Sequence, residues 1–114
     1  MRNNRPLVLL LLACCLAQPA FGQVWFGVRD CGQWIERLGG TSRVEQITSE
    51  GWLAGFMSGL NWMYWLNHKD TGDPLSKVNS QAQMVLWMDN YCNKNPLSTT
   101  KQGGHELFIE LMKK

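Results

Sequence analysis

The sequence predicts a small all-α protein, a four-helix orthogonal-type bundle closed by one disulfide bond. Apolar residues recur at helical spacing in several segments, and no segment shows the alternation that is typical of a β-strand. An uncharged run without proline extends over residues 51–66 and is long enough to form the central helix. Two of the four cysteines, Cys31 and Cys92, lie inside the predicted helical domain.

Residues 1–22 have the pattern of a secretory signal peptide. A positively charged start precedes a leucine-rich apolar run, and Ala20-Phe21-Gly22 fits the small-x-small pattern of a cleavage site. Cleavage there would leave residues 23–114 as a single helical domain in the periplasm or outside the cell. The alternative is a lipoprotein anchored at Cys14, because Leu11-Leu12-Ala13-Cys14 resembles a lipobox.

Removal of the leader also removes the net charge. The full chain has 11 Lys+Arg, and nine remain without Arg2 and Arg5, against nine Asp+Glu. A neutral chain without a basic run offers no electrostatic basis for binding nucleic acid or an anionic membrane surface. We therefore expect neither as a partner.

The first predicted helix follows an apolar arm at residues 23–29. Asp30 and Gln33 have the spacing of a capping box, and Gly39-Gly40 predicts the end of the helix. The apolar residues between them follow the i, i+3, i+4, i+7 pattern of one helix face: Cys31, Trp34, Ile35 and Leu38. We interpret the polar residues 41–50 as a connector that enters the central helix around Thr48 or Ser49.

The central helix is predicted over residues 51–66. Gly51, Gly55 and Gly59 recur every four residues and form a smooth face on which another helix could pack closely. The run is shorter than the roughly 20 apolar residues of a membrane span. We therefore expect the helix to lie inside a bundle, and we expect no integral membrane span.

Two further helices are predicted after the central one. Residues 67–74 are rich in turn-forming residues and predict an exposed loop. A helix then begins at Ser80 and ends before Asn95-Pro96, and the last helix covers residues 99–112. Their predicted buried residues are Met84, Trp87, Met88 and Tyr91 in the first, and Leu107, Phe108, Leu111 and Met112 in the second.

Cysteine usage predicts one disulfide bond, Cys31–Cys92. Cys14 and Cys15 belong to the predicted leader, and two cysteines in an exported chain usually pair. The bond would join the first predicted helix to the third. Closing a loop of about 60 residues would contribute roughly 4 kcal/mol to stability.

The sequence shows no pattern of metal ligands or catalytic residues. The four candidate ligands are far apart and form no C-x-x-C or H-x-x-x-H pair: Cys31, His68, Cys92 and His105. A disulfide also leaves no thiolate nucleophile. Asp89 is the only acid set among aromatic residues, and we interpret it as a solvated or helix-capping residue. We predict no enzymatic activity, no cofactor and no metal.

Six tryptophans are many for a chain of 114 residues. Most of them fall on apolar helix faces, which favours core packing for any single one. The alternative is an apolar groove for segments of other proteins, and the six methionines favour it because their side chains adapt to varied partners. Phe56, Trp62 and Trp65 are the candidate residues of that binding surface.

Three short motifs occur in order along the chain. They are Cys31-x-x-Trp34, Gly55-Phe56-x-x-Gly59, and Trp87-x-x-x-Tyr91-Cys92 followed by Asn95-Pro96-Leu97. With the leader, they resemble small exported bacterial helical proteins of the HdeA/HdeB type. That resemblance implies a helical periplasmic acid-stress chaperone with a Cys31–Cys92 bridge. The layout is also similar to the amidase-immunity proteins of type VI secretion systems, which share a glycine-bearing second helix.

We therefore expect a chaperone-like protein that acts by binding other proteins, as a monomer or a weak homodimer. The alternative is an immunity protein that inhibits one secreted cell-wall-degrading effector. Below about pH 4 the carboxylates lose their charge while Lys, Arg and His stay positive, so self-repulsion could loosen the bundle and expose apolar residues.

Overall fold

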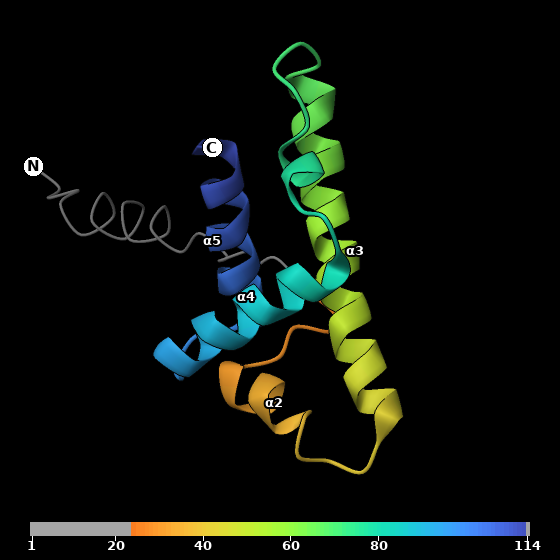
Figure 1. Ribbon diagram of the computed structural model, residues 1–114, viewed down its shortest axis with the longest axis vertical. Coiled ribbons are helices and arrows are strands. Elements are labelled where there is room, and N and C mark those ends of the chain that lie inside the picture. The colour runs from red at the N-terminus through yellow and green to blue at the C-terminus, as the bar shows by residue number, and fades with distance from the viewer. Residues whose placement is uncertain (1–23, 114) are drawn as a thin grey trace, which may run out of the picture.

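The fold is all-α, as predicted (Figure 1). The computed structural model describes residues 24–113, so the predicted signal peptide and Cys14 lie outside the described residues. Within 24–113 there is no strand, only an isolated bridge between Asp30 and Thr99. The elements are α2 Cys31–Glu36, α3 Arg43–Asn67, the 3-10 helix η1 Pro74–Lys77, α4 Gln81–Lys94 and α5 Thr100–Lys113.

Helix α3 is longer than predicted because it begins at Arg43 rather than around Thr48 or Ser49. The hydroxyl of Ser42 accepts a hydrogen bond from the Glu45 N–H and caps the helix. The interpretation of residues 41–50 as a connector was therefore wrong from Arg43 onward. The first residues of α3 are mostly polar, so they lack the apolar spacing by which a helix is predicted from sequence.

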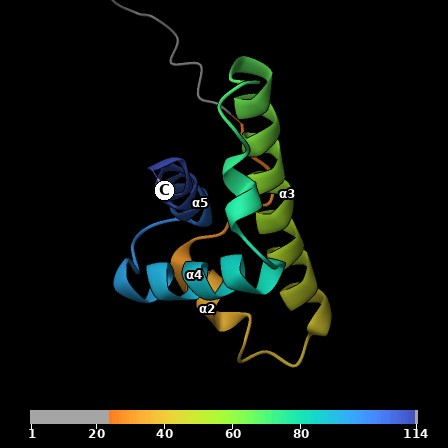
Figure 2. The ribbon, with the colours of Figure 1, turned by 45° about the horizontal axis from the view of Figure 1, so that its top comes forward.

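The helices meet at steep angles rather than lying side by side (Figures 1 and 2). α3 runs along the long axis of the molecule, α4 crosses its lower half, and α2 lies beneath α4. α5 packs on both α4 and α3, and η1 packs against α3 and α5. The core contains Cys31, Trp34, Leu53, Met57, Met84, Met88, Cys92, Leu107, Phe108 and Leu111. Met112, predicted to be buried, is exposed because it lies in the last turn of α5 on the outer side.

The predicted Cys31–Cys92 disulfide is present and joins α2 to α4. The two Cα atoms are 4.8 Å apart, and both side chains are buried. Beside the bond, the Cys31 N–H donates to the Ser98 carbonyl at 2.9 Å, and the Thr100 N–H donates to the Arg29 carbonyl at 2.9 Å. The short helix α2 is thus tied to the turn that connects α4 and α5.

Two glycines outside the central helix allow α5 to approach its neighbours closely. A β-carbon at Gly103 would lie 2.6 Å from Met88 Sδ and 2.8 Å from Tyr91 Cδ1, and one at Gly104 would lie 2.6 Å from Phe56 Cε1. Both positions are buried. No helix between residues 24 and 113 combines the length and the apolar character that crossing a membrane requires.

Candidate functional site

The two faces of α3 have different environments. Leu53 and Met57 are completely buried, and Leu60 and Tyr64 pack against the core at the same helical side. The opposite side of α3 points away from the other helices, and in both ribbon views no element covers it (Figures 1 and 2). We call this the outward face of α3. It includes the exposed residues Val44, Ile47, Gly51, Gly55, Ser58, Gly59, Trp62 and Trp65.

The prediction that Gly51, Gly55 and Gly59 pack against another helix was wrong. A β-carbon at any of the three would meet nothing within 4 Å. The larger apolar side chains on the other side of α3 bury more surface, so they turn inward and the glycines turn outward. Within the described residues, the helix-packing glycines are Gly103 and Gly104 of α5 instead.

Trp62 and Trp65 form an exposed aromatic pair near the end of α3. Their rings stack with centroids 5.2 Å apart, and the two residues are 58% and 40% exposed. Met63 and Leu66 beside them are exposed as well, and Lys69 Nζ lies 5.4 Å from the centroid of the Trp65 ring. We call these four apolar residues, Trp62, Met63, Trp65 and Leu66, the Trp62–Trp65 patch.

Phe56 does not belong to this patch, in contrast to the prediction. Its ring stacks on Trp52 at 4.9 Å and contacts the edge of Trp25 at 5.8 Å and His105 at 5.4 Å. This second cluster fixes the N-terminal arm, because Trp52 Nε1 also donates to the Phe26 carbonyl at 2.7 Å. Phe56 lies on a different side of the helix from Trp62, and so it has a structural role at the junction of the arm, α3 and α5.

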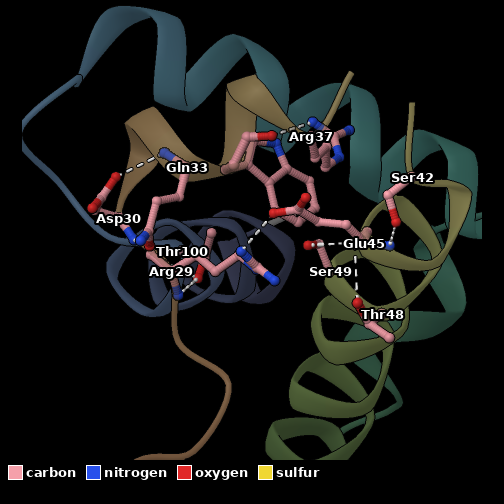
Figure 3. Close-up of polar contacts among 10 residues, drawn as sticks. Arg29, Asp30, Gln33, Arg37, Ser42, Glu45, Thr48, Ser49 and Thr100 are labelled. Atoms are coloured by element: carbon pink, nitrogen blue, oxygen red, sulfur yellow. Dashed lines mark hydrogen bonds and ion pairs between the residues drawn. The ribbon is translucent and has the colours of Figure 1, made fainter. Parts of the chain in front are cut away.

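The outward face of α3 is uncharged. Between Arg43 and Lys69 the only acidic residues are Glu45 and Glu50, and each is held on another side of the helix. Glu45 Oε1 lies 3.0 Å from Arg29 Nη1, and the Glu45 N–H donates a hydrogen bond to the hydroxyl of Ser42 (Figure 3). Glu50 Oε1 lies 3.5 Å from Arg37 Nη2. These ion pairs direct the charges away from the outward face.

Arg37 is the centre of a buried polar cluster that sequence reasoning missed. The residue is 2% exposed, and its guanidinium lies 4.0 Å above the Trp34 ring. Nη1 donates to the Trp34 carbonyl at 2.8 Å (Figure 3), while Nη2 forms an ion pair with Asp89 Oδ1 at 2.9 Å. Arg37 caps the C-terminal end of α2, two residues before the glycines that were predicted to end this helix, and a charged residue there carried no signal of burial in the sequence.

Asp89 is a partner in this cluster rather than a solvated residue. Its Oδ1 accepts a hydrogen bond from Trp34 Nε1 at 2.8 Å in addition to the ion pair with Arg37. The interpretation of Asp89 as solvated or capping was therefore wrong. The cluster joins α2, α3 and α4 around one buried cation, and removing a carboxylate partner from a buried cation is costly.

The described residues bring together no group of three or more His, Cys, Asp or Glu side chains that could hold a metal. His68 stacks on Tyr64 at 4.3 Å, while His105 lies in the aromatic cluster of the arm. A surface hollow of about 500 Å³ lies between α4 and α5. Its lining includes the stacked pair Trp87 and Tyr91, with ring centroids 5.4 Å apart.

Comparisons with known proteins give no further guide to the site. No protein-family model matches the chain, and neither a curated protein nor a solved structure matches it.

Proposed function

We propose that this protein is a small exported protein of the bacterial envelope that acts by binding other proteins in a chaperone-like manner, without enzymatic activity. The observation that carries the proposal is the Trp62–Trp65 patch, in which two stacked tryptophans remain exposed at the end of an uncharged helix face. The resemblance to proteins of the HdeA/HdeB type agrees with this function.

The chemistry of the patch suits the binding of varied apolar segments. Tryptophan supplies a large contact area and is enriched among the residues that dominate protein–protein binding. Met63 adds a flexible side chain that adapts to different partners. Within residues 24–113, Lys69 is the one cation that an aromatic ring of the patch contacts, so the patch has little charge selectivity. Low selectivity favours many clients over a single partner.

The proposed location follows from two features. The buried Cys31–Cys92 disulfide is typical of an oxidising compartment, and residues 1–22 have the pattern of a signal peptide. We therefore propose that the protein is located in the periplasm or outside the cell. An anchor at Cys14 is the alternative, and intact mass of the exported protein distinguishes the two because a lipid adds mass.

The test uses a double variant, Trp62→Ala with Trp65→Ala, in an assay of aggregation of unrelated unfolded proteins. The parent should reduce light scattering at acid pH or at pH 7, and the double variant should lose most of that effect. The matched control is Leu86→Ala with Leu97→Ala, which removes exposed apolar side chains from other surfaces. A parent that protects no client at either pH would refute the proposal.

One observation favours the immunity protein as a second candidate. The disulfide and the Arg37 cluster hold α2, α3 and α4 together, so the outward face of α3 is rigid before any partner binds. A rigid surface loses little entropy on binding and suits one tight partner. Capture of one stoichiometric cell-wall-degrading enzyme at pH 7, with inhibition of its activity, would establish this candidate in place of the chaperone.

A further inference from the structure

The hollow between α4 and α5 has one wall from each helix. Trp87, Tyr91 and Asn95 follow one another every four positions on α4, and Glu106 and Glu110 have the same spacing on α5. Residues four positions apart lie on the same face of a helix. The hollow therefore places an aromatic wall opposite a wall with two carboxylates.

Both aromatic side chains of the α4 wall already donate their polar hydrogens within the chain. Trp87 Nε1 donates to Glu110 Oε2 at 3.0 Å. The Tyr91 hydroxyl lies 2.8 Å from Ser98 Oγ. Because the Ser98 hydroxyl donates its own proton to Gln102 Oε1 at 2.9 Å, the donor in the first contact is Tyr91. A ligand in the hollow thus receives no hydrogen bond from either ring.

The groups that remain available in the hollow accept hydrogen bonds. Asn95 Nδ2 donates to the Tyr91 carbonyl at 2.9 Å, which leaves Asn95 Oδ1 as an acceptor. The Glu106 side chain is exposed, and no cation among residues 24–113 lies within 4.0 Å of its carboxylate. A carboxylate accepts only. This wall therefore favours a ligand that is rich in donors and carries positive charge.

The buried Arg37 cluster shows which cation suits such a pair of walls. There Trp34 Nε1 donates to Asp89 Oδ1 at 2.8 Å, and the Arg37 guanidinium lies 4.0 Å from the centroid of the same ring. Trp87 and Glu110 repeat the indole-to-carboxylate hydrogen bond in the hollow. Among the described residues no cation lies over the Trp87 ring, whereas one lies over each of three other tryptophans.

We propose that the hollow between α4 and α5 is a binding site for a guanidinium group, which lies over the Trp87 ring and pairs with the Glu106 carboxylate. A guanidinium is planar, stacks on aromatic faces and has five N–H donors but no acceptor. It therefore matches a lining whose aromatic donors are in use and whose remaining acceptors are not. A saccharide matches less well, because its hydroxyls need donors as well as acceptors from the site.

The remaining lining residues set the strength of the site. Ile109 is 39% exposed and offers an apolar surface for the alkyl part of an arginine side chain. Lys113 also lines the hollow, and its positive charge opposes a second cation. The volume of about 500 Å³ lies within the range of small-ligand sites. Because the hollow is open to solvent, we expect weak binding, with a dissociation constant of roughly a millimolar.

The ligand is tested by nuclear magnetic resonance titration of the exported protein with L-arginine and with L-citrulline. Citrulline has nearly the same shape but carries no charge. Arginine should shift the Trp87 Nε1–H signal, which is assigned by its loss in Trp87→Phe, and should bind at least about tenfold more tightly than citrulline. Equal affinities of the two compounds would overturn the proposal, and so would an N-acetylglucosamine disaccharide that binds more tightly than arginine.

Two variants of exposed residues should change the affinity in opposite directions. Glu106→Gln removes the carboxylate and should weaken arginine binding about fivefold or more. Lys113→Gln removes the opposing charge and should strengthen it about twofold. The matched control is Glu36→Gln on α2, which changes the net charge by the same amount at an exposed site outside the hollow. Equal effects of Glu106→Gln and Glu36→Gln would overturn the site.

The guanidinium has two possible sources, free arginine and an arginine side chain of another protein. A blocked Ala-Arg-Ala peptide distinguishes them. Tighter binding of the peptide than of arginine assigns the site to a partner's side chain, and equal or weaker binding assigns it to the free amino acid. The site does not rest on the Trp62–Trp65 patch, so the double variant Trp62→Ala with Trp65→Ala should bind arginine like the parent. Loss of client protection with retained arginine binding would thus count against the proposed function alone.

Discussion

Gly103→Ala tests the packing of α5 on α4. It should lower the free energy of unfolding, whereas the same substitution at a glycine of α3 should raise it. The new β-carbon would lie 2.6 Å from Met88 Sδ and 2.8 Å from Tyr91 Cδ1. Met88 is fully buried and cannot withdraw freely. Overpacking of this kind costs about 1–3 kcal/mol, and the better helix propensity of alanine returns about 1 kcal/mol. We expect an overpacking cost of about 2–3 kcal/mol at this position, and therefore a net loss of about 1–2 kcal/mol in the free energy of unfolding.

Gly55→Ala is the matched comparison in α3. No atom lies within 4 Å of its β-carbon, so only the propensity term acts and stability should rise by about 0.5–1 kcal/mol. Thermal melts followed by circular dichroism at low protein concentration measure both. For a domain of this size each kcal/mol changes the melting temperature by about 4–8 °C. A melting temperature of Gly103→Ala at or above the parent value would refute the close approach of α5 to α4.

Two other changes test what holds the bundle together. Asp89→Asn removes the 2.9 Å ion pair with Arg37. We expect the free energy of unfolding to fall by about 2–3 kcal/mol, which is less than the full effect of breaking a buried pair. The effect is reduced because Glu50 still pairs with Arg37 and because Asp89 is partly exposed. Urea unfolding measures it, the exposed Glu36→Gln is the control, and equal midpoints would contradict the cluster's role. Reduction of Cys31–Cys92 should lower the free energy of unfolding by roughly 4 kcal/mol. Unchanged urea midpoints with and without reductant would contradict that estimate.

The sequence by itself determined the secondary structure class, the disulfide and most helix boundaries. These are local or covalent properties. Ser80 and Asn95-Pro96 mark the limits of α4, whose bounds are Gln81 and Lys94. The capping box of Asp30 and Gln33 is present as predicted. The pairing of Cys31 with Cys92 required only that two cysteines remain in the domain.

The tertiary structure decided which side of the central helix faces the core. The helix is apolar nearly all round, so periodicity gave two possible faces, and the glycine face was the wrong one. The side of the helix that buries the larger apolar area against its neighbours turns inward. Leu53 and Met57 bury this area against α4 and α5. Tertiary contacts also place Phe56 against Trp52 rather than beside Trp62 and Trp65. They likewise bury Arg37 against Asp89. Each of these depends on residues distant in the chain, which no local pattern records.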